Sequence, residues 1–357
     1  MKNLYTSWDL NLLAENMISK IDENWHNPFC PPAVIFTDPK EEQWFKLYWL
    51  KNKTGRNAVL MNLKTLRIQQ FLFDLVKPDS GALINDNALH IEKLSVELLR
   101  DVLISKLTSK TDDGKYYFET LGPADVKSYL TDKDACGVSK INPIRLYDFA
   151  QQTATLFMDY EDTRPDSLNQ VLEKSDWQKK LYHDIYTDGA IVINDTCYMT
   201  LFQLTELNSK MNGGQLHFNW KNDIPLFIFG FSGLGQIYRK ILDEFSKQNQ
   251  LEVYLQTSQP AAGKTADFKN QLTSKWATYG RENLDLWSKD STITQLEADT
   301  STDSLLHKIQ KAISQDYEII PQAFTGDRDG SSGHEASLTL TSAPTKLREV
   351  EAVHSKI

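Results

Sequence analysis

An unbroken apolar run, followed by glycines and an amphipathic helix, constrains the fold of this chain more than any other feature. The run is Leu226–Phe229, and its lack of polar alternation predicts a strand buried on both faces of a parallel sheet. Gly230, Gly233 and Gly235 end the run, and apolar residues then recur at helical spacing as far as Leu242. A strand, a tight turn and a helix in this order predict an α/β fold, in which such turns commonly hold phosphates or catalytic acids.

The residues of this turn do not match the site types that such turns form. A nucleophile elbow requires G-x-S-x-G, but Leu234 stands where the last glycine is needed. A dinucleotide-binding turn requires G-x-G-x-x-G, and the glycine spacing here runs the other way. An NTPase holds Mg²⁺ through an aspartate at the strand end, where this chain has Phe229 and Gly230. The sequence therefore predicts a turn without catalytic chemistry.

The first predicted strand, near Leu4, also lacks a phosphate-binding loop. A P-loop requires G-x-x-x-x-G-K-[ST], whereas this strand continues into "YTSWDLNLL", which contains neither glycine nor lysine. A partial match is Gly263–Thr265, "GKT", but Ser258 replaces the required earlier glycine and Pro260 stiffens the loop. We expect the shape of an NTPase domain without its chemistry, and an active nucleotide-binding domain that uses the loop around Lys264 is the alternative.

The distribution of strand and helix patterns predicts several domains in the 357 residues. Strands alternate with helices in residues 1–88 and again in residues 213–335, which predicts one discontinuous α/β domain. Helical periods dominate residues 89–212, which we interpret as a mostly α-helical insertion. Residues 336–357 contain a strand pattern and a helix start, and they are expected to begin a second, truncated domain.

Three local patterns give finer expectations. Apolar residues at helical spacing predict that a helix over residues 89–107 opens the insertion. The sequence "AVLMNL" predicts a third strand over residues 58–63 of the α/β domain. After the predicted strand at 251–257, helices are expected to continue to about residue 316.

Composition restricts the possible partners and compartments. The net charge of −9 excludes binding of nucleic acid through whole-molecule charge, so any such role needs a local basic patch. The cysteines number three and lie far apart, which argues against a disulfide framework or a zinc site and for a reducing compartment. No apolar run approaches the about 20 residues of a membrane span, and the first residues lack a secretory pattern. We therefore expect a cytoplasmic protein without a membrane partner.

A segment that follows the second predicted strand combines aromatic and basic side chains. Proteins that bind single-stranded nucleic acid use aromatic rings to stack bases and cations to contact the backbone. The alternative is an amphipathic helix with Trp44, Leu47 and Tyr48 facing the core and the lysines in solvent. Both interpretations fit the pattern. The cations of the candidate patch are Lys46, Lys51, Lys53, Arg56, Lys64 and Arg67, and its aromatic residues are Trp44, Phe45, Tyr48 and Trp49.

Several stretches, taken together and in order, resemble the RecC family, the gamma chains of exodeoxyribonuclease V. They are "LYTSWDLNLLAENMI", "PFCPPAVIFTDPKEEQWFK", "LYDFAQQTATLFMDYEDTRPDSL", "PLFIFGFSGLGQIYRKILDEF" and "LTSAPTKLREVEAVHSKI". The resemblance implies a P-loop/RecA-like superfamily 1 helicase domain that is degenerate and has no Walker motifs. The loss of the ATPase residues agrees with the missing P-loop and the missing aspartate.

The resemblance also implies a non-catalytic DNA-binding and scaffolding role in double-strand break repair and recombination. Such a chain holds RecB-like and RecD-like subunits, guides the split strands of double-stranded DNA ends as single-stranded DNA, and takes part in reading Chi. ATP and Mg would be bound by the partner subunits, so no cofactor is expected in this chain, and the compartment would be the bacterial cytoplasm. A protein-interaction scaffold without DNA contact is the other alternative.

In the RecC family, residues that line the DNA channel come partly from the loop and helix after the second strand. This implies DNA-binding roles for Thr37, Asp38, Gln43 and Trp44, in addition to the cations of the candidate patch. Gln43 and Trp44 match the family's motif, whereas Thr37 and Asp38 occupy the loop but differ in kind from its polar pattern.

Overall fold

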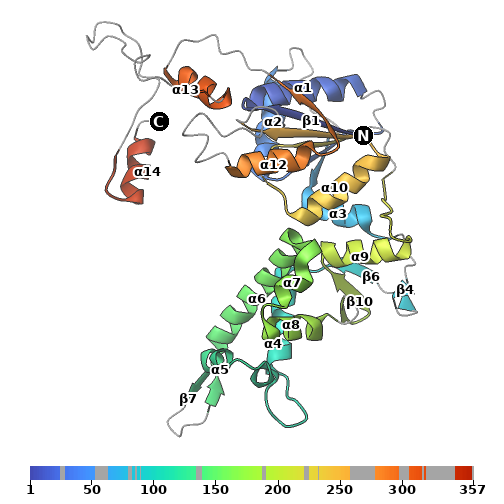
Figure 1. Ribbon diagram of the computed structural model, residues 1–357, viewed down its shortest axis with the longest axis vertical. Helices are drawn as coiled ribbons and strands as arrows, with labels where there is room; N and C mark the ends of the chain where they lie inside the picture. Colours follow the sequence, from blue (N-terminus) through green and yellow to red (C-terminus); the bar gives the residue numbers. More distant parts are fainter. Residues whose placement is uncertain are drawn as a thin grey trace.

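A computed structural model gives the protein as a six-stranded α/β body next to a mainly helical body (Figure 1). Among the helices in the described ranges, none is long and apolar enough to span a bilayer. The described residues are 1–24, 29–52, 63–78, 83–84, 87–88, 90–133, 139–186, 190–220, 225–231, 233–257, 278–296, 305–315, 317–318 and 342–355.

The α/β body is built on one sheet whose strand pairs are all parallel. This mainly parallel sheet confirms the predicted α/β class and is compatible with a RecA-like fold. The strands are β1 (Lys2–Ser7), β2 (Ala33–Phe36), β3 (Lys64–Arg67), β11 (Leu226–Phe229), β12 (Leu251–Gln256) and β13 (Ser291–Gln295), in the spatial order β13-β1-β12-β11-β2-β3.

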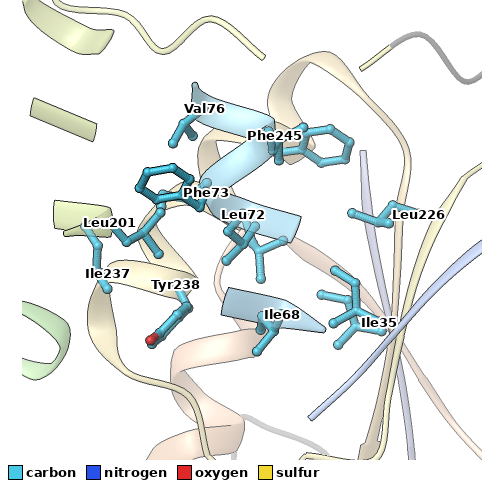
Figure 2. Close-up of a cluster of buried hydrophobic side chains, with 14 of the residues drawn as sticks. Ile35, Ile68, Leu72, Phe73, Val76, Leu201, Leu226, Ile237, Tyr238 and Phe245 are labelled. Carbon is cyan, nitrogen blue, oxygen red and sulfur yellow. The ribbon is translucent and has the colours of Figure 1, made fainter. Parts of the chain in front are cut away.

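The apolar run of β11 is explained by burial on both sides of the sheet. Leu226 and Ile228 join the core under one layer of helices, whereas Phe227 and Phe229 join the core under the other. Because successive side chains of a strand point to opposite faces, a strand covered on both sides carries apolar residues throughout. One face is covered by α1 (Leu10–Asn24) and α2 (Pro39–Asn52), and the other by α3 (Ile68–Val76), α10 (Gln236–Gln248) and α12 (Thr278–Ser288) (Figure 2).

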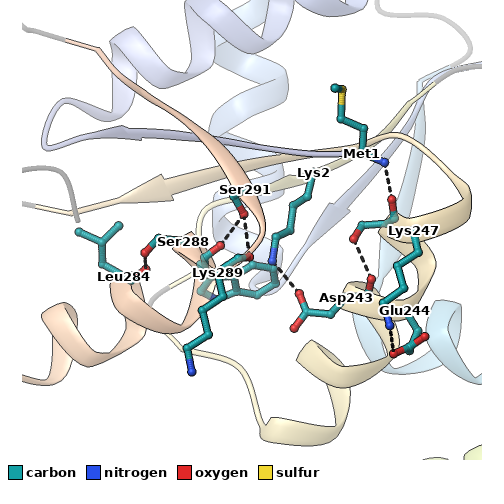
Figure 3. A network of polar contacts seen from close by, with 11 residues as sticks. Met1, Lys2, Asp243, Glu244, Lys247, Leu284, Ser288, Lys289 and Ser291 are labelled. Atoms are coloured by element: carbon teal, nitrogen blue, oxygen red, sulfur yellow. Dashed lines mark hydrogen bonds and ion pairs between the residues drawn. The ribbon is translucent and has the colours of Figure 1, made fainter. Parts of the chain in front are cut away.

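An ion pair ties the first strand to α10. Lys2 is 4% exposed, and its Nζ lies 2.7 Å from Oδ1 of Asp243 (Figure 3). The same ammonium lies 5.7 Å from the ring centre of Trp287 on α12. The contacts of Lys2 therefore join β1, α10 and α12 on one side of the sheet.

The helical body has a hydrophobic core of its own, which includes Leu99, Leu103, Ala150 and Phe157. Small sheets lie beside its helices: β6 (His90–Lys93), β10 (Thr196–Met199) and β9 (Ile191–Ile193) form one, and β7 (Thr131–Lys133) pairs with β8 (Ser139–Ile141). The pair β4 (Leu83–Ile84) and β5 (Asn87–Ala88) precedes them. The helices are α4 (Val96–Thr108), η1 (Tyr117–Thr120), α5 (Ala124–Leu130), α6 (Pro143–Thr163), η2 (Pro165–Ser167), α7 (Leu168–Leu172) and α8 (Asp176–Ile185).

The two cores meet at α9 (Leu201–Met211), which packs against α3, α6 and α10. Leu201 and Leu204 belong to the core of the sheet, together with Cys197 and Met199 of β10. Residues from the predicted insertion therefore contribute to both cores.

Some local expectations were wrong. The helix predicted over 89–107 is a strand followed by a helix, because residues 90–93 pair with β10 and Ser95 then caps α4 by accepting the Leu98 N–H at 3.1 Å. β13 lies inside the region predicted to be helical, where it pairs with β1. The strand predicted over 58–63 falls almost entirely outside the described residues, and β3 begins at Lys64. Two further helices, α13 (Leu305–Ser314) and α14 (Lys346–His354), follow β13.

Candidate nucleic-acid interface

The carboxyl ends of the parallel strands are where α/β proteins usually bind ligands. β1 passes into α1 through Trp8 and Asp9. The N–H of Asn11 donates to Oδ1 of Asp9 at 2.8 Å, so the first turn of α1 is capped by the chain's own carboxylate. An aspartate in this position occupies the space that a bound phosphate would need, and its negative charge repels a phosphate.

The glycine turn after β11 begins with a residue whose backbone conformation favours glycine. Gly230 has a φ of 66°, which disfavours any side chain. A Cβ atom at this residue would lie 2.8 Å from Oε2 of Glu41. The carbonyl of Gly230 accepts a hydrogen bond from the Thr37 hydroxyl at 2.9 Å, so the turn is packed directly against the start of α2.

The end of the same turn is packed against the helical body. A Cβ atom on Gly235 would lie 2.8 Å from the carbonyl oxygen of Asp162, at the end of α6. The Tyr238 hydroxyl donates to Oδ2 of Asp162 at 2.8 Å, and Nζ of Lys240 lies 3.0 Å from Oδ1 of Asp166. The amino end of α10 is therefore covered by carboxylates and a carbonyl of the helical body, and the turn acts as a packing joint.

The residues at the start of α2 for which the resemblance implied DNA contacts mainly stabilise the start of this helix. Oδ1 of Asp38 accepts the N–H of Lys40 at 2.8 Å, which caps the helix. Thr37 is half-buried, and its hydroxyl also lies 3.2 Å from Oε2 of Glu41. Burial raises the pKa of Glu41, and the contact with Thr37 opposes that rise. Gln43 is exposed on the first turns of the helix.

The aromatic residues of α2 are mainly part of the core. Phe45 and Trp49 are buried, and the half-buried Trp44 stacks on Tyr48 with ring centres 5.2 Å apart and on Phe229 at 6.2 Å. The prediction that Leu47 faces the core was wrong, because its side chain is 67% exposed. Leu47 lies about 200° around the helix from Phe45, so the core-facing stripe passes through Phe45 and Trp49 instead.

Two predicted cations meet at one carboxylate between α2 and β3. Nζ of Lys46 lies 2.6 Å from Glu42, and Nη2 of Arg67 lies 3.5 Å from the same side chain. The hydrogen bond from Lys46 is the main cause that lowers the pKa of Glu42, so this carboxylate is held in its charged form. Lys46 and Arg67 together exceed the charge of Glu42 by one, so this group of three side chains carries a net positive charge.

The other predicted cations are spread more widely. Lys51 is exposed near the end of α2. Lys64 is exposed on β3, and strand alternation directs it to the opposite face from Thr65 and Arg67. Lys53 and Arg56 lie outside the described residues, as does the GKT segment around Lys264.

Sequence reasoning missed the acidic partners of this surface. The pair Glu42–Lys46 is an i, i+4 pair on one helix, a spacing that could have been found from the sequence. The approach of Arg67 depends on the pairing of β2 with β3, which no local pattern revealed. Within the described residues no group of three or more histidine, cysteine, aspartate or glutamate side chains could hold a metal ion.

Comparison with known proteins gives one family match. The model described as "RecC, N-terminal domain" matches residues 3–316, which include both bodies from β1 to α13. No curated protein matches the chain.

Proposed function

The chain belongs to the RecC family through its N-terminal domain, and from this premise we propose that it is a non-catalytic DNA-binding and scaffolding subunit of a RecBCD-type helicase–nuclease. In this proposal it acts in double-strand break repair and recombination together with RecB-like and RecD-like subunits. It binds double-stranded DNA ends and the single strands split from them, and it contributes to the reading of Chi. ATP and Mg are bound by the partner subunits.

The observation that carries the proposal is which residues follow β1 and β11. A motor domain needs a glycine-rich phosphate loop after its first strand and an acid that holds Mg²⁺ at a later strand end. Here β1 is followed by Trp8 and Asp9, and β11 ends at Phe229 and Gly230. These residues support a degenerate superfamily 1 helicase domain, with residues 1–88 and 213–335 as its α/β part and residues 89–212 as an insertion. Residues 336–357 would begin a second such domain.

The DNA contact that we propose runs along α2 and β3, through the candidate patch. The excess positive charge of Lys46 and Arg67 over Glu42 supports contacts to phosphates, and Lys51 on α2 and Lys64 on the other face of β3 are exposed on the same two elements. The exposed Gln43 and the half-buried Trp44 would contact bases from the same helix. Because Trp44 already stacks on two rings, its substitution would also disturb packing, so the cations provide the cleaner test.

We would titrate the chain into a fluorescent forked DNA over a range of salt concentrations. The variant replaces Lys51, Lys64 and Arg67 with alanine, and the control replaces the exposed lysines Lys174, Lys247 and Lys289. Each lost phosphate contact with single-stranded DNA should reduce the slope of log K against log salt by about 0.7. The patch variant should therefore show a slope smaller by about 2, and the control variant should bind with a nearly unchanged slope.

The outcome separates the proposal from its alternatives. Equal slopes for the two variants would rule out the patch on α2 and β3. Binding of the subunit partner without binding of any DNA would favour the pure scaffold. Tight binding of MgATP that is abolished by Lys264→Ala would favour an active nucleotide-binding domain.

A further inference from the structure

A buried glutamate lies where the core of the helical body meets the core of the sheet. Glu161, on the last turn of α6, is 1% exposed. Its Oε1 accepts hydrogen bonds from the Tyr182 hydroxyl of α8 and from Nε2 of Gln203 on α9, the second at 3.2 Å. Its Oε2 is buried and has no hydrogen-bond partner among the described residues. An ionised carboxylate with an unpaired buried oxygen is costly, so this group requires a proton, a cation or water.

A small cavity adjoins this carboxyl group. Its volume is about 30 Å³, which is room for roughly one water molecule. Leu94 on its wall belongs to the core of the helical body, whereas Leu201 and Tyr238 belong to the core of the sheet. Figure 2 shows the side chains of Leu201 and Tyr238 among the buried hydrophobic residues of the sheet body. The polar residues that line the cavity are Gln69, Lys93, Glu161, Asp162, Thr200 and Tyr238.

The charges that face Glu161 favour a proton over a metal ion. On α6 the next residue, Asp162, is a second carboxylate, and Asp159 adds a further negative charge nearby. α9 contributes the uncharged Thr200 and Gln203. α8 and its end contribute Tyr182 and Tyr186, and α10 contributes Tyr238; burial raises the pKa of all three phenols, so they stay neutral. From β6, Lys93 places an ammonium on the cavity wall, which disfavours a divalent cation there.

We propose that protonation of Glu161 closes the joint between the helical body and the sheet body, and that its ionisation loosens that joint. With the proton bound, the carboxyl group is neutral and needs no further solvation at the contact between the two bodies. When the proton leaves, the unpaired charge beside Asp162 draws water into the cavity and weakens the packing of α6 against α9 and α10. The joint is sensitive to the charge of Glu161 because its other contacts are made by the next residue, Asp162, which contacts Gly235 and Tyr238.

The electrostatics place the transition near neutral pH. Burial, reinforced by the charge of Asp162, raises the pKa of Glu161 from 4.5 to about 7, although the neighbouring side chains of Thr200, Tyr182 and Gln203 oppose the rise. The folded chain therefore holds this proton more tightly than the unfolded chain. The contribution to stability is complete below the ordinary pKa, falls as the pH rises from 4.5 to about 7, and is absent above it. A displacement of this size corresponds to a change of roughly a hundredfold in the folding equilibrium constant.

The test compares urea unfolding of wild type with Glu161→Gln between about pH 5 and about pH 8. Glutamine is the uncharged isostere of glutamate. From the lower to the upper end of this range, the folding equilibrium constant of wild type should therefore fall by roughly a hundredfold more than that of the variant. At the upper end the variant should be more stable than wild type. Glu206→Gln removes an exposed glutamate of α9 and should follow the wild-type profile. Parallel profiles for wild type and Glu161→Gln would overturn the proposal.

Two measurements on the wild-type chain do not depend on the variant being folded. Hydrogen exchange, corrected for the intrinsic effect of pH, should accelerate at the end of α6 and the start of α10 as the pH rises past neutrality. Infrared difference spectra should show a protonated carboxyl band that disappears over the same range. If neither change occurs, Glu161 does not gate the joint. Stabilisation of the wild type but not of Glu161→Gln by added Mg²⁺ or Ca²⁺ at the upper end of the range would assign the cavity to a cation and refute the role of the proton.

Discussion

Replacing Gly235 with alanine should destabilise the protein although the residue has an ordinary backbone conformation. The new methyl carbon would lie 2.8 Å from the Asp162 carbonyl oxygen and 3.0 Å from two ring atoms of Tyr238. The carbonyl is backbone at the end of α6 and cannot rotate away, so α6 and α10 must separate. Overpacking of this kind costs about 1–3 kcal/mol, which exceeds the about 0.4–1 kcal/mol gained by restricting the unfolded chain. The net loss should be about 1–2 kcal/mol.

Gly280→Ala provides a matched control for this prediction. Gly280 lies within α12, and among the residues that the structure describes none has an atom within 4 Å of the position that a Cβ atom would take. The same substitution there should stabilise the protein by about 0.5–1 kcal/mol, because alanine favours the helix. Urea unfolding of the two variants should therefore give free-energy changes of opposite sign. If Gly235→Ala were neutral or stabilising, the tight packing of α10 against the helical body would be refuted.

Two further substitutions test contacts between distant parts of the chain. Lys2→Ala removes the cation that pairs with Asp243 at 2.7 Å, and urea unfolding should show a loss of about 1–3 kcal/mol, whereas alanine at the exposed Lys289 should change little. Asn208→Ala leaves the buried carbonyl of Val76 and the N–H of His217 without their present partner, at 2.6 and 2.9 Å. That variant should lose about 2–4 kcal/mol, and a loss below about 0.5 kcal/mol would show that water replaces the amide.

The local patterns of the chain predicted the strands that are buried on both faces. Leu226–Phe229 was identified from its apolar run because burial on two sides leaves no place for a polar residue. The reason for Gly235 was not predictable, because the atom that excludes a side chain belongs to Asp162 in another part of the sequence. The strand at 90–93 was missed for a similar reason, since its partner β10 is distant and its residues also fit a helical period.

The candidate interface was predictable only in part. The residue types on α2 could be read from the sequence, but its buried side was predicted to carry Trp44, Leu47 and Tyr48, whereas the buried residues are Phe45 and Trp49. The meeting of Lys46 and Arg67 at Glu42 depends on which strand lies beside β2, and a single sequence does not specify that neighbour. The DNA-binding roles of these residues stay predictions.

The order of the strands in the sheet has a consequence for the synthesis of this chain. β1 lies between β12 and β13, and β2 lies between β3 and β11, so both partners of β1 and one partner of β2 are encoded after the whole helical body. The buried residues of the core of the helical body all lie within 94–191, which allows most of this core to form while the ribosome is still translating. Until Leu226–Phe229 and Leu251–Gln256 emerge, one edge of β2 and both edges of β1 lack their strand partners. Chaperones should therefore engage the nascent chain at the unpaired edges of β1 and β2.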